Sequence, residues 1–442
     1  MIPAIRQSGA GMAKLVDARD LKSLGALLRA GSIPAPGTNT LRSRKRTLLA
    51  GRDRGAGGIV RLAFLSIGRH IHTERWIRWF AERDCECHLL TVQPGPVPGV
   101  AVHDIRAGFG PKPLRYAASL GVVKKLLTRI RPDLLNTHFL TGYGYWGDFS
   151  GFRPNVLTVW GDDVYVTPHE SRLKNWLARR ALRNCDALTG DSADILSCSA
   201  ALGADPAQSY RILWGVDFDV FRPFDALHWR REKGFADDDL VFFSPRSYTQ
   251  PYYNIDTVIA AAAQVRAQEP RARFLFAGYE GDPEPFRQKA RAAGIEDVMA
   301  MVGRLPHEEF ATALNASDVF ISVPSVDATA VSLLEAMSCA CGIIISSLPS
   351  SLEWIQDQRS GLVVEPRNVD DLTAAMLRFA RDDTFCRSSG EAALATARHW
   401  AGFDTNMEYV RRIFEQQVSG QGSGPEEVSL PTLIKAKGGP RP

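Results

Sequence analysis

The chain of 442 residues has no long apolar segment. A membrane-spanning helix needs about 20 consecutive apolar residues, and no uninterrupted run approaches that length. Arg, Lys and Asp also interrupt the apolar stretches near the N-terminus, where a signal peptide would have its apolar core. The sequence therefore predicts a cytoplasmic protein without a membrane span.

Cysteine is scarce, and its spacing fits neither disulfides nor zinc. The seven cysteines are scattered and odd in number, which argues against a disulfide framework. Two Cys-x-Cys pairs occur, at Cys85 and Cys87 and at Cys339 and Cys341, but neither has the second ligand pair of a zinc site. We expect reduced thiols and no metal.

The excess of positive charge is confined to the first part of the chain. The formal net charge is +4, but residues 1–58 alone carry eleven Lys and Arg against three Asp. The remaining 384 residues therefore carry a net charge of −4. Because the body is mildly acidic, the charge does not predict a nucleic-acid partner.

Residues 1–58 also differ from the rest in composition, with abundant Gly, Ala, Arg and Ser and poor periodicity. One interpretation is a disordered basic tail. The alternative is an extension outside the native coding region, because Gly31-Ser-Ile-Pro34 can be encoded by a typical T-arm sequence of a transfer RNA gene. Translation would then begin near Val60. Residues 419–442, rich in Gly and Pro, are predicted to form a disordered tail.

From Val60 onward, apolar strand-like runs alternate with helical periodicity, which predicts an α/β fold with doubly wound parallel sheets. The junction Trp214-Gly-Val-Asp217 separates two such series. The expected strands are 59–66, 87–92, 134–137, 156–159 and 187–190, then 241–244, 273–277, 298–302, 318–323 and 343–346, and helices are expected at 74–83, 370–381 and 403–417. Ligands of such sheets bind at the carboxyl ends of the strands.

Two carboxylates, Asp327 and Glu335, stand eight positions apart across a predicted loop-to-helix junction. The junction offers backbone N–H groups at Thr329, Ala330 and Val331 and the positive end of the helix dipole. A phosphate can bind there while the carboxylates accept hydrogen bonds from sugar hydroxyls, which suits a nucleotide-sugar. The alternative is that Asp327 is a turn or capping residue and Glu335 lies on a solvated helix face.

The half from about Arg211 to Asp382 resembles the donor domain of the retaining GT-B glycosyltransferases of family 4, also called glycosyl transferases group 1. The matching motifs keep the family's order and spacing: Trp214-Gly-Val-Asp217, Ser244-Pro-Arg246, Phe276-Ala-Gly278, Val302-Gly-Arg-Leu305, the acidic pair, Glu335-Ala-Met337, Ser360-Gly-Leu-Val-Val364 and the final helix with Trp400. The N-terminal half matches more loosely.

The resemblance implies a GT-B fold of two Rossmann-like domains facing a central cleft. Residues 59–213 would form the acceptor-side domain and 214–385 the nucleotide-sugar donor domain. Residues 386–418 would form helices that cross back to the first domain.

By the same resemblance, Glu335 would hold the ribose hydroxyls of the donor, and Asp327 would contact hydroxyls of the transferred sugar. Arg246 would bind the pyrophosphate, because its planar guanidinium can donate two parallel hydrogen bonds; the alternative is a surface salt bridge. The loop beside the nucleobase would consist of Gly303, Arg304 and Leu305, which could also be an ordinary strand-end turn.

Three departures from the family pattern bear on activity. Tyr253 stands where relatives usually have a second phosphate-binding Lys, and a hydroxyl stabilises a leaving pyrophosphate less than an ammonium does. Ala328 replaces the usual Gly after the first acid, which narrows the room for close backbone approach. The usual Gly-x-Pro after the helix reads Ala340-Cys-Gly342.

In the N-terminal half, Trp160-Gly-Asp-Asp163 ends a predicted strand where many relatives carry His. We therefore predict Asp163 as the catalytic base that takes the acceptor proton, and His138 as the second candidate for this role. The alternative is that Asp163 caps a helix or fixes the loop. His70 and His72 could line the acceptor pocket. No metal or cofactor is expected, apart from the nucleotide-sugar co-substrate.

The predicted helix Ser171–Asn184 is basic and amphipathic, with no acid and with Trp176 among its apolar residues. Such helices can lie on anionic membranes, and in related transferases this domain often docks to reach lipid-linked acceptors. The sequence therefore allows peripheral binding to the inner face of the plasma membrane. The alternative is a sheet-covering helix with a solvated basic side.

The function that these residues predict is retaining transfer of a sugar from a nucleotide-diphosphate-sugar to a saccharide or lipid-linked hydroxyl acceptor. The family relation suggests surface polysaccharide or glycolipid biosynthesis. Two alternatives stay open: a non-catalytic GT-B protein that binds nucleotide-sugar or an assembly partner, and a nucleotide-sugar epimerase.

Overall fold

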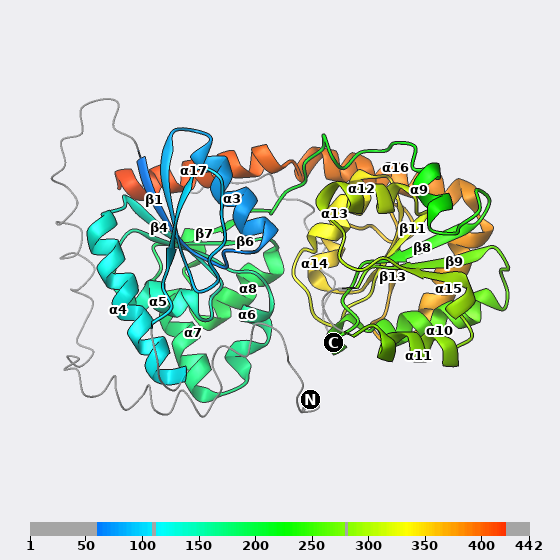
Figure 1. The fold of residues 1–442 in the computed structure, drawn as a ribbon, viewed down its shortest axis with the longest axis horizontal. Helices are drawn as coiled ribbons and strands as arrows, with labels where there is room; N and C mark the ends of the chain where they lie inside the picture. The colour runs from blue at the N-terminus through cyan, green and yellow to red at the C-terminus, as the bar shows by residue number, and fades with distance from the viewer. Residues whose placement is uncertain (1–59, 108–111, 279–281, 421–442) are drawn as a thin grey trace.

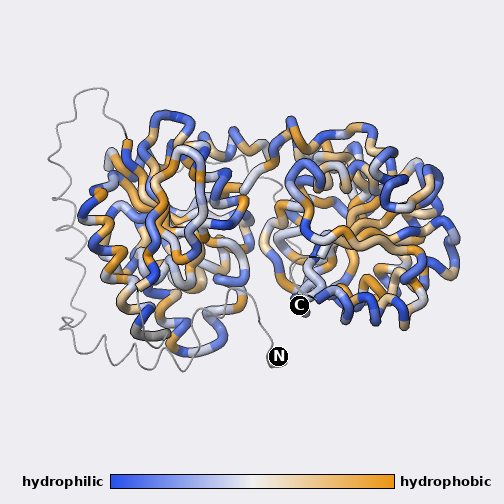
Figure 2. Tube along the Cα trace, in the orientation of Figure 1, coloured by the Kyte–Doolittle hydropathy of each residue, from blue (hydrophilic) through white to orange (hydrophobic). Residues whose placement is uncertain are grey.

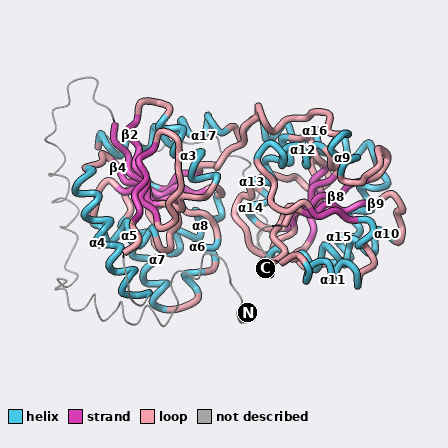
Figure 3. The backbone as a smooth tube through the Cα atoms, in the orientation of Figure 1, coloured by secondary structure: helices cyan, strands magenta, loops and turns pink. Residues whose placement is uncertain are grey.

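The computed structural model describes residues 60–107, 112–278 and 282–420. These residues form two α/β lobes, each with a central sheet surrounded by helices (Figures 1 and 3). The predictions for residues 1–58, and those for the tail beyond residue 420, lie outside the described residues.

Within the described residues, the first lobe contains a seven-stranded sheet in the order β3-β2-β1-β4-β5-β6-β7. All of its strand pairs are parallel. Its strands are β1 (Val60–Leu65), β2 (Cys85–Thr91), β3 (Val100–Asp104), β4 (Leu134–His138), β5 (Asn155–Thr158), β6 (Ala187–Gly190) and β7 (Ser209–Arg211). Its helices are α3 (Ile71–Ala81), α4 (Lys112–Ile130), α5 (Tyr143–Ser150), α6 (Asp162–Tyr165), α7 (Arg172–Asn184) and α8 (Ala193–Leu202).

The second lobe has a sheet in the order β10-β9-β8-β11-β12-β13, again with parallel pairs. Its strands are β8 (Leu240–Ser244), β9 (Ala272–Phe276), β10 (Met299–Met301), β11 (Val319–Ser322), β12 (Gly342–Ser346) and β13 (Leu362–Val364). Its helices are α9 (Leu227–Glu232), α10 (Ile255–Arg266), α11 (Glu284–Ala292), α12 (His307–Asn315), α13 (Val331–Ser338), α14 (Pro349–Leu352), α15 (Val369–Arg381) and α16 (Asp383–Trp400).

The last helix, α17 (Phe403–Ser419), returns to the first lobe (Figure 1). Met407, Val410, Ile413 and Phe414 are buried there in the same cluster as residues of β1 and α3. The rings of Phe80 and Phe414 stack with centroids 5.1 Å apart. The apolar face of α17 therefore belongs to the core of the N-terminal domain.

Between residues 60 and 420 the described chain crosses between the lobes twice, and the two crossings are hydrogen-bonded to each other. The amide of Val216 donates to the carbonyl of Ala401 at 2.6 Å, and the amide of Phe403 donates to the carbonyl of Val216 at 3.0 Å. Gly215 has φ +70° here, and a Cβ on it would lie 2.5 Å from the Cα of Phe403. Only glycine fits this junction without strain.

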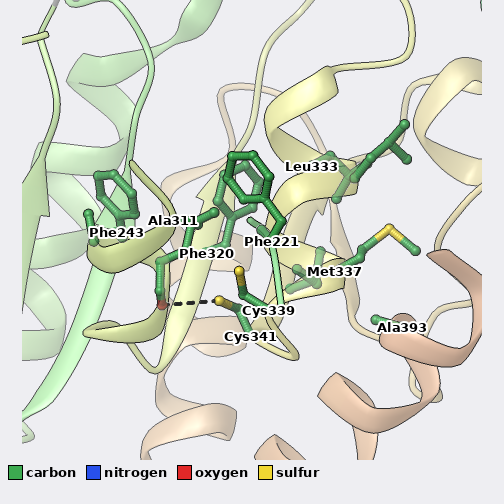
Figure 4. Close-up of a cluster of buried hydrophobic side chains, with 14 of the residues drawn as sticks. Phe221, Phe243, Ala311, Phe320, Leu333, Met337, Cys339, Cys341 and Ala393 are labelled. Atoms are coloured by element: carbon green, nitrogen blue, oxygen red, sulfur yellow. Dashed lines mark hydrogen bonds between the residues drawn. The ribbon is translucent and has the colours of Figure 1, made fainter. Parts of the chain in front are cut away.

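Apolar residues concentrate on the strands and on the inner faces of the helices (Figure 2). One cluster packs beneath α13 and includes Phe221, Phe320 and Met337 (Figure 4). Cys341 belongs to it, and its Sγ donates to the carbonyl of Leu314 at 3.4 Å. This tight packing fixes the helix that carries Glu335.

Except for β3, β7 and β13, the sequence predicted the strands of both sheets with end shifts of at most two residues. It missed β3, because this strand is only half-buried and lacks a continuous apolar run. It also missed β7 and β13, which have three residues each. Parallel sheets with alternating helices confirm the predicted α/β class.

Candidate functional site

Glu335 lies on α13 and is 6% exposed, so it is not on a solvated helix face. Burial raises the pKa of its carboxyl to about 7, an effect that the positive charge of Arg75 opposes. Arg75 belongs to α3 of the other domain. A buried carboxylate that faces a positive side chain across the domain interface can accept hydrogen bonds from ligand hydroxyls.

Asp327 and Arg246 pair with each other. The Arg246 Nη2 lies 2.9 Å from the Asp327 Oδ2, and the Arg246 Nε donates to the Ser322 Oγ at 2.7 Å. The guanidinium carbon of Arg246 lies 5.0 Å from the ring centre of Tyr253. Burial raises the pKa of Asp327, and the Arg246 charge opposes this rise. A diphosphate would therefore meet a guanidinium that already has one carboxylate partner.

The start of α13 differs from the sequence prediction at one amide. The Thr329 amide donates to the Asp191 Oδ1 at 3.3 Å, and the Thr329 hydroxyl donates to the Asp191 carbonyl at 2.8 Å. The Thr329 N–H is therefore not free for a phosphate, because a buried carboxylate of the N-terminal domain accepts it. Within the described residues, the amides of Ala330 and Val331 have no hydrogen-bond acceptor. An anion could bind these two groups.

The loop of Gly303, Arg304 and Leu305 follows β10, at the carboxyl end of its sheet. Gly303 has φ +56°, a left-handed conformation that favours glycine. Burial, together with the positive charge of Arg304, lowers the pKa of His70 to about 4. The loop therefore lies near the N-terminal domain's first strand-to-helix turn.

Asp163 serves as an acceptor for backbone amides. Its carboxylate accepts hydrogen bonds from the amides of Leu140 at 2.7 Å, Gly161 at 2.7 Å and Trp160 at 3.1 Å. Asp163 is 1% exposed. This geometry favours the loop-fixing role over the predicted role of catalytic base, since a substrate hydroxyl would have to displace an amide.

His138 lies at the end of β4 and is fully buried. Its Nε2 lies 2.8 Å from the Asn136 Oδ1, and the Asn136 amide nitrogen donates to the Val156 carbonyl and to the Thr158 hydroxyl. Because Oδ1 is thus the acceptor, Nε2 carries the hydrogen. Burial lowers the pKa of His138 to about 3, so the ring is neutral.

An aromatic cluster covers His138. The ring centroids of Trp160 and Trp214 are 4.3 Å apart, and both rings contact His138. His70 lies edge-on to Trp160 at 5.0 Å, and His72 stacks on Trp214 at 5.5 Å. His70, His72 and Trp160 are partly exposed. They can offer an acceptor an apolar wall, whereas His138 lies behind it.

Further contacts join the domains on the side of α8. The Arg211 Nη2 lies 2.8 Å from the Glu353 Oε2. The other oxygen of Glu353 accepts the amide hydrogens of Ala193 at 2.9 Å and Asp194 at 3.3 Å, at the start of α8. The sequence alone did not predict a role for Arg75 or Glu353, because neither residue belongs to a recognisable motif. Their roles depend on contacts across the domain interface.

Helix α7 keeps an amphipathic pattern, but most of its basic side chains have partners within the domain. Lys174 pairs with Glu170, and the Arg180 Nε lies 2.7 Å from the Asp148 Oδ2. Trp176 is 50% exposed. The basic surface available to an anionic membrane is therefore smaller than the sequence suggests.

In the part of the chain that the structure describes, no three His, Cys, Asp or Glu side chains gather in a way that could hold a metal ion. Nor does any described helix combine the length and apolarity needed to cross a membrane.

Comparison with solved structures shows that the two facing α/β domains have the GT-B fold of glycosyltransferases. Residues 225–396 match the family Glycosyl transferases group 1, and residues 61–192 match Glycosyl transferase 4-like. The two segments together span more than half of the chain, and both family models describe glycosyltransferases, so the chain belongs to the glycosyltransferases.

A D-inositol 3-phosphate glycosyltransferase of Kribbella flavida is 30% identical over 207 residues, which cover 44% of this chain and 48% of the relative. The match thus spans about half the length of that relative. Sucrose-phosphate synthase from Thermosynechococcus elongatus superposes with a TM-score of 0.71 at 16% identity, over 82% of this chain and 100% of that chain. HepE of Anabaena in complex with UDP-glucose superposes with a TM-score of 0.69 at 15% identity, over 80% of this chain and 99% of that chain. These two structures share the fold.

Proposed function

We propose that this protein is a retaining glycosyltransferase that moves a sugar, of hexose type, from a nucleotide-diphosphate-sugar to a hydroxyl acceptor. The observation that carries the proposal is the arrangement around α13. A buried carboxylate, Glu335, lies on the same short helix whose first turn offers the free amides of Ala330 and Val331. The Arg246–Asp327 pair precedes that helix in the same domain.

Each group has a chemical task in this proposal. Glu335 accepts hydrogen bonds from the ribose hydroxyls, and the loop of Gly303, Arg304 and Leu305 borders the nucleobase. Arg246 and the amides of Ala330 and Val331 stabilise the negative charge that develops on the departing diphosphate. Asp327, released from part of its contact with Arg246, accepts hydrogen bonds from the transferred sugar.

Contact between the domains supports a reaction shielded from water. The Thr329–Asp191 and Arg211–Glu353 contacts hold the donor loop against the N-terminal domain. A closed arrangement strengthens electrostatic stabilisation inside and prevents hydrolysis of the donor. We propose no cofactor beyond the donor, because protein groups suffice to hold the diphosphate.

The acceptor would bind against His70, His72 and Trp160 on the N-terminal wall. We propose a saccharide or lipid-linked acceptor from surface polysaccharide or glycolipid biosynthesis, reached at the cytoplasmic face of the membrane. Trp176, half-exposed on the basic helix α7, supports peripheral contact with an anionic surface. The paired state of Lys174 and Arg180 limits the strength of that contact.

Calorimetry with uridine, guanosine and adenosine diphosphates and their sugars tests the donor site. We expect one nucleotide-sugar to bind, and we expect Glu335→Ala and Arg246→Ala to weaken it by about 10- to 100-fold, the value of one or two charge-assisted hydrogen bonds. Glu391→Ala, at an exposed position of α16, is the control. NMR of the product then reports the anomeric configuration, and inversion would contradict the retaining mechanism.

Two further outcomes point to the other candidates. Binding of a donor without transfer to any acceptor extract would favour a non-catalytic binding protein, a result that Tyr253 in place of a phosphate-binding Lys could explain. Conversion of the donor to an isomeric nucleotide-sugar would indicate an epimerase.

A further inference from the structure

Asp162 and Asp163 are neighbours in sequence, but their carboxylates have different surroundings. Asp163 is buried and accepts three backbone amides. Asp162, the first residue of α6, is exposed. Among the described residues, no side chain forms a hydrogen bond or ion pair with the Asp162 carboxylate; the neighbouring amide of Asp163 is the one group that favours its charged form. The turn thus immobilises one acid and leaves the other available.

The position of Asp162 follows from the contact between the domains at the preceding residue. Gly161 packs against Ala328: a Cβ on Gly161 would lie 3.6 Å from the Cβ of Ala328 and 3.9 Å from its backbone nitrogen. Ala328 is 3% exposed and packs in an apolar cluster of the N-terminal domain. Asp162 and Asp327 each adjoin this contact, so the two carboxylates lie near each other from opposite domains.

The charges around Asp162 agree with this placement. Although Asp162 keeps a solvent-exposed side, the protein atoms around it partly desolvate its carboxylate and raise its pKa to about 6, and the negative charges of Asp163, Asp327 and Glu170 contribute to the rise. Asp162 in turn raises the pKa of the Tyr252 hydroxyl, whose own burial is the main cause of its shift. Tyr252 and Asp327 belong to the donor domain, so Asp162 faces the side from which the donor sugar would be presented.

We infer that Asp162 is the catalytic base that receives the proton of the acceptor hydroxyl. This inference rests on the proposed glycosyl transfer. The acceptor oxygen forms a bond to the anomeric carbon on the face that the diphosphate leaves, as retention requires, and the bond from that carbon to the diphosphate oxygen breaks and leaves its electron pair on the diphosphate. The acceptor O–H bond breaks, and its proton passes to a carboxylate oxygen of Asp162. No oxidant, reductant or metal enters this balance.

The other acids and bases nearby are less suited to this task. The Asp163 carboxylate is held by amides, and Asp327 is paired with Arg246 at 2.9 Å. His138 is fully buried behind Trp160. A base must come within hydrogen-bond reach of the proton that it takes, and of these groups only Asp162 presents an uncommitted carboxylate to solvent.

The test is steady-state kinetics of the full-length protein with the donor and acceptor that it uses. We expect Asp162→Asn to lower kcat by about 100-fold or more, the usual contribution of a general base. Donor affinity measured by calorimetry should stay unchanged. In the wild type, kcat should fall as pH drops through about 6. This decrease on the acid side of the pH profile should be absent in Asp162→Asn. Asp162→Glu should restore part of the rate.

Asp163→Asn is the control at the neighbouring residue. We expect it to lower the melting temperature, and we expect its kcat still to fall on the acid side of the pH profile. If Asp162→Asn keeps a kcat within about threefold of wild type with the same pH profile, the inference is overturned while the glycosyltransferase assignment stands. If the wild type neither binds nor transfers any nucleotide-sugar, the proposed function fails and this inference fails with it.

Discussion

The guanidinium of Arg211 and the carboxylate of Glu353 meet across the domain interface at 2.8 Å, and the two side chains are only 15% and 14% exposed. Neither residue belongs to the donor or acceptor groups described above. Glu353 also accepts the first amides of α8, so this donor-domain carboxylate contacts two separate segments of the N-terminal domain.

Replacing Glu353 by Gln should weaken this closed arrangement. The substitution leaves the mostly buried guanidinium of Arg211 without its ion-pair partner, which is costly. We expect donor affinity to fall on the order of tenfold, within the usual range of coupling between sites, and the radius of gyration in small-angle X-ray scattering to increase. Unchanged scattering and affinity in Glu353→Gln would contradict a role in closure.

Glu335 should make the fold less stable as pH rises. Burial raises its pKa to about 7 from an ordinary value of 4.5, so the folded state holds the proton more tightly than the unfolded chain does. The free energy of unfolding should therefore decrease between about pH 4.5 and 7 and then level off, by on the order of 2 to 3 kcal/mol from this group. The free energy of unfolding of Glu335→Gln, measured with urea, should lack this decrease with pH. The same dependence on pH in the variant and the wild type would contradict the raised pKa of Glu335.

Arg246 should distinguish nucleoside diphosphates from monophosphates. Its guanidinium is the charged group that we assign to the pyrophosphate, so Arg246→Ala should remove most of the affinity difference between the two ligands, about 10- to 100-fold. Arg246→Lys should keep part of it, because the charge remains but the forked geometry is lost. Arg378→Ala, on the exposed side of α15, is the control. A full diphosphate preference in Arg246→Ala would exclude this role.

Gly215 should tolerate no side chain. Its φ of +70° and the 2.5 Å approach of a Cβ to the Cα of Phe403 predict that Gly215→Ala destabilises the protein, by at least about 2 kcal/mol from left-handed strain and steric overlap. Gly121, in α4, has nothing within 4 Å of such a Cβ, so Gly121→Ala should be neutral or stabilising by about 0.5 to 1 kcal/mol. Thermal unfolding of the two variants checks the contrast, and equal melting temperatures would contradict it.

The sequence predicted the sheets well because their central strands are continuous apolar runs, such as Val319–Ser322, buried on both faces. It also predicted that Arg246 would follow a strand and that Glu335 would lie on the helix after a later strand of the same domain, since these positions follow from the order of the elements. The half-exposed edge strand Val100–Asp104 has no such run, and it becomes a strand through pairing with β2.

The sequence could not assign the roles of Asp162 and Asp163. The two residues are chemically identical, and which carboxylate receives the amides depends on the backbone path at Gly161, with φ +153° and ψ −93°. Similarly, the amide of Thr329 looked free because its acceptor, Asp191, lies 138 positions away in sequence. Contacts between domains are not encoded in local pattern or spacing.

The return of α17 to the first lobe affects the order in which the chain can fold during synthesis. Domains usually fold from the N-terminus as they emerge from the ribosome. Here the N-terminal sheet lacks part of its core until Met407, Val410 and Phe414 have been made. The C-terminal domain, whose strands end at Val364, has its whole sheet earlier. The second domain of this protein can therefore complete its sheet before the first completes its core.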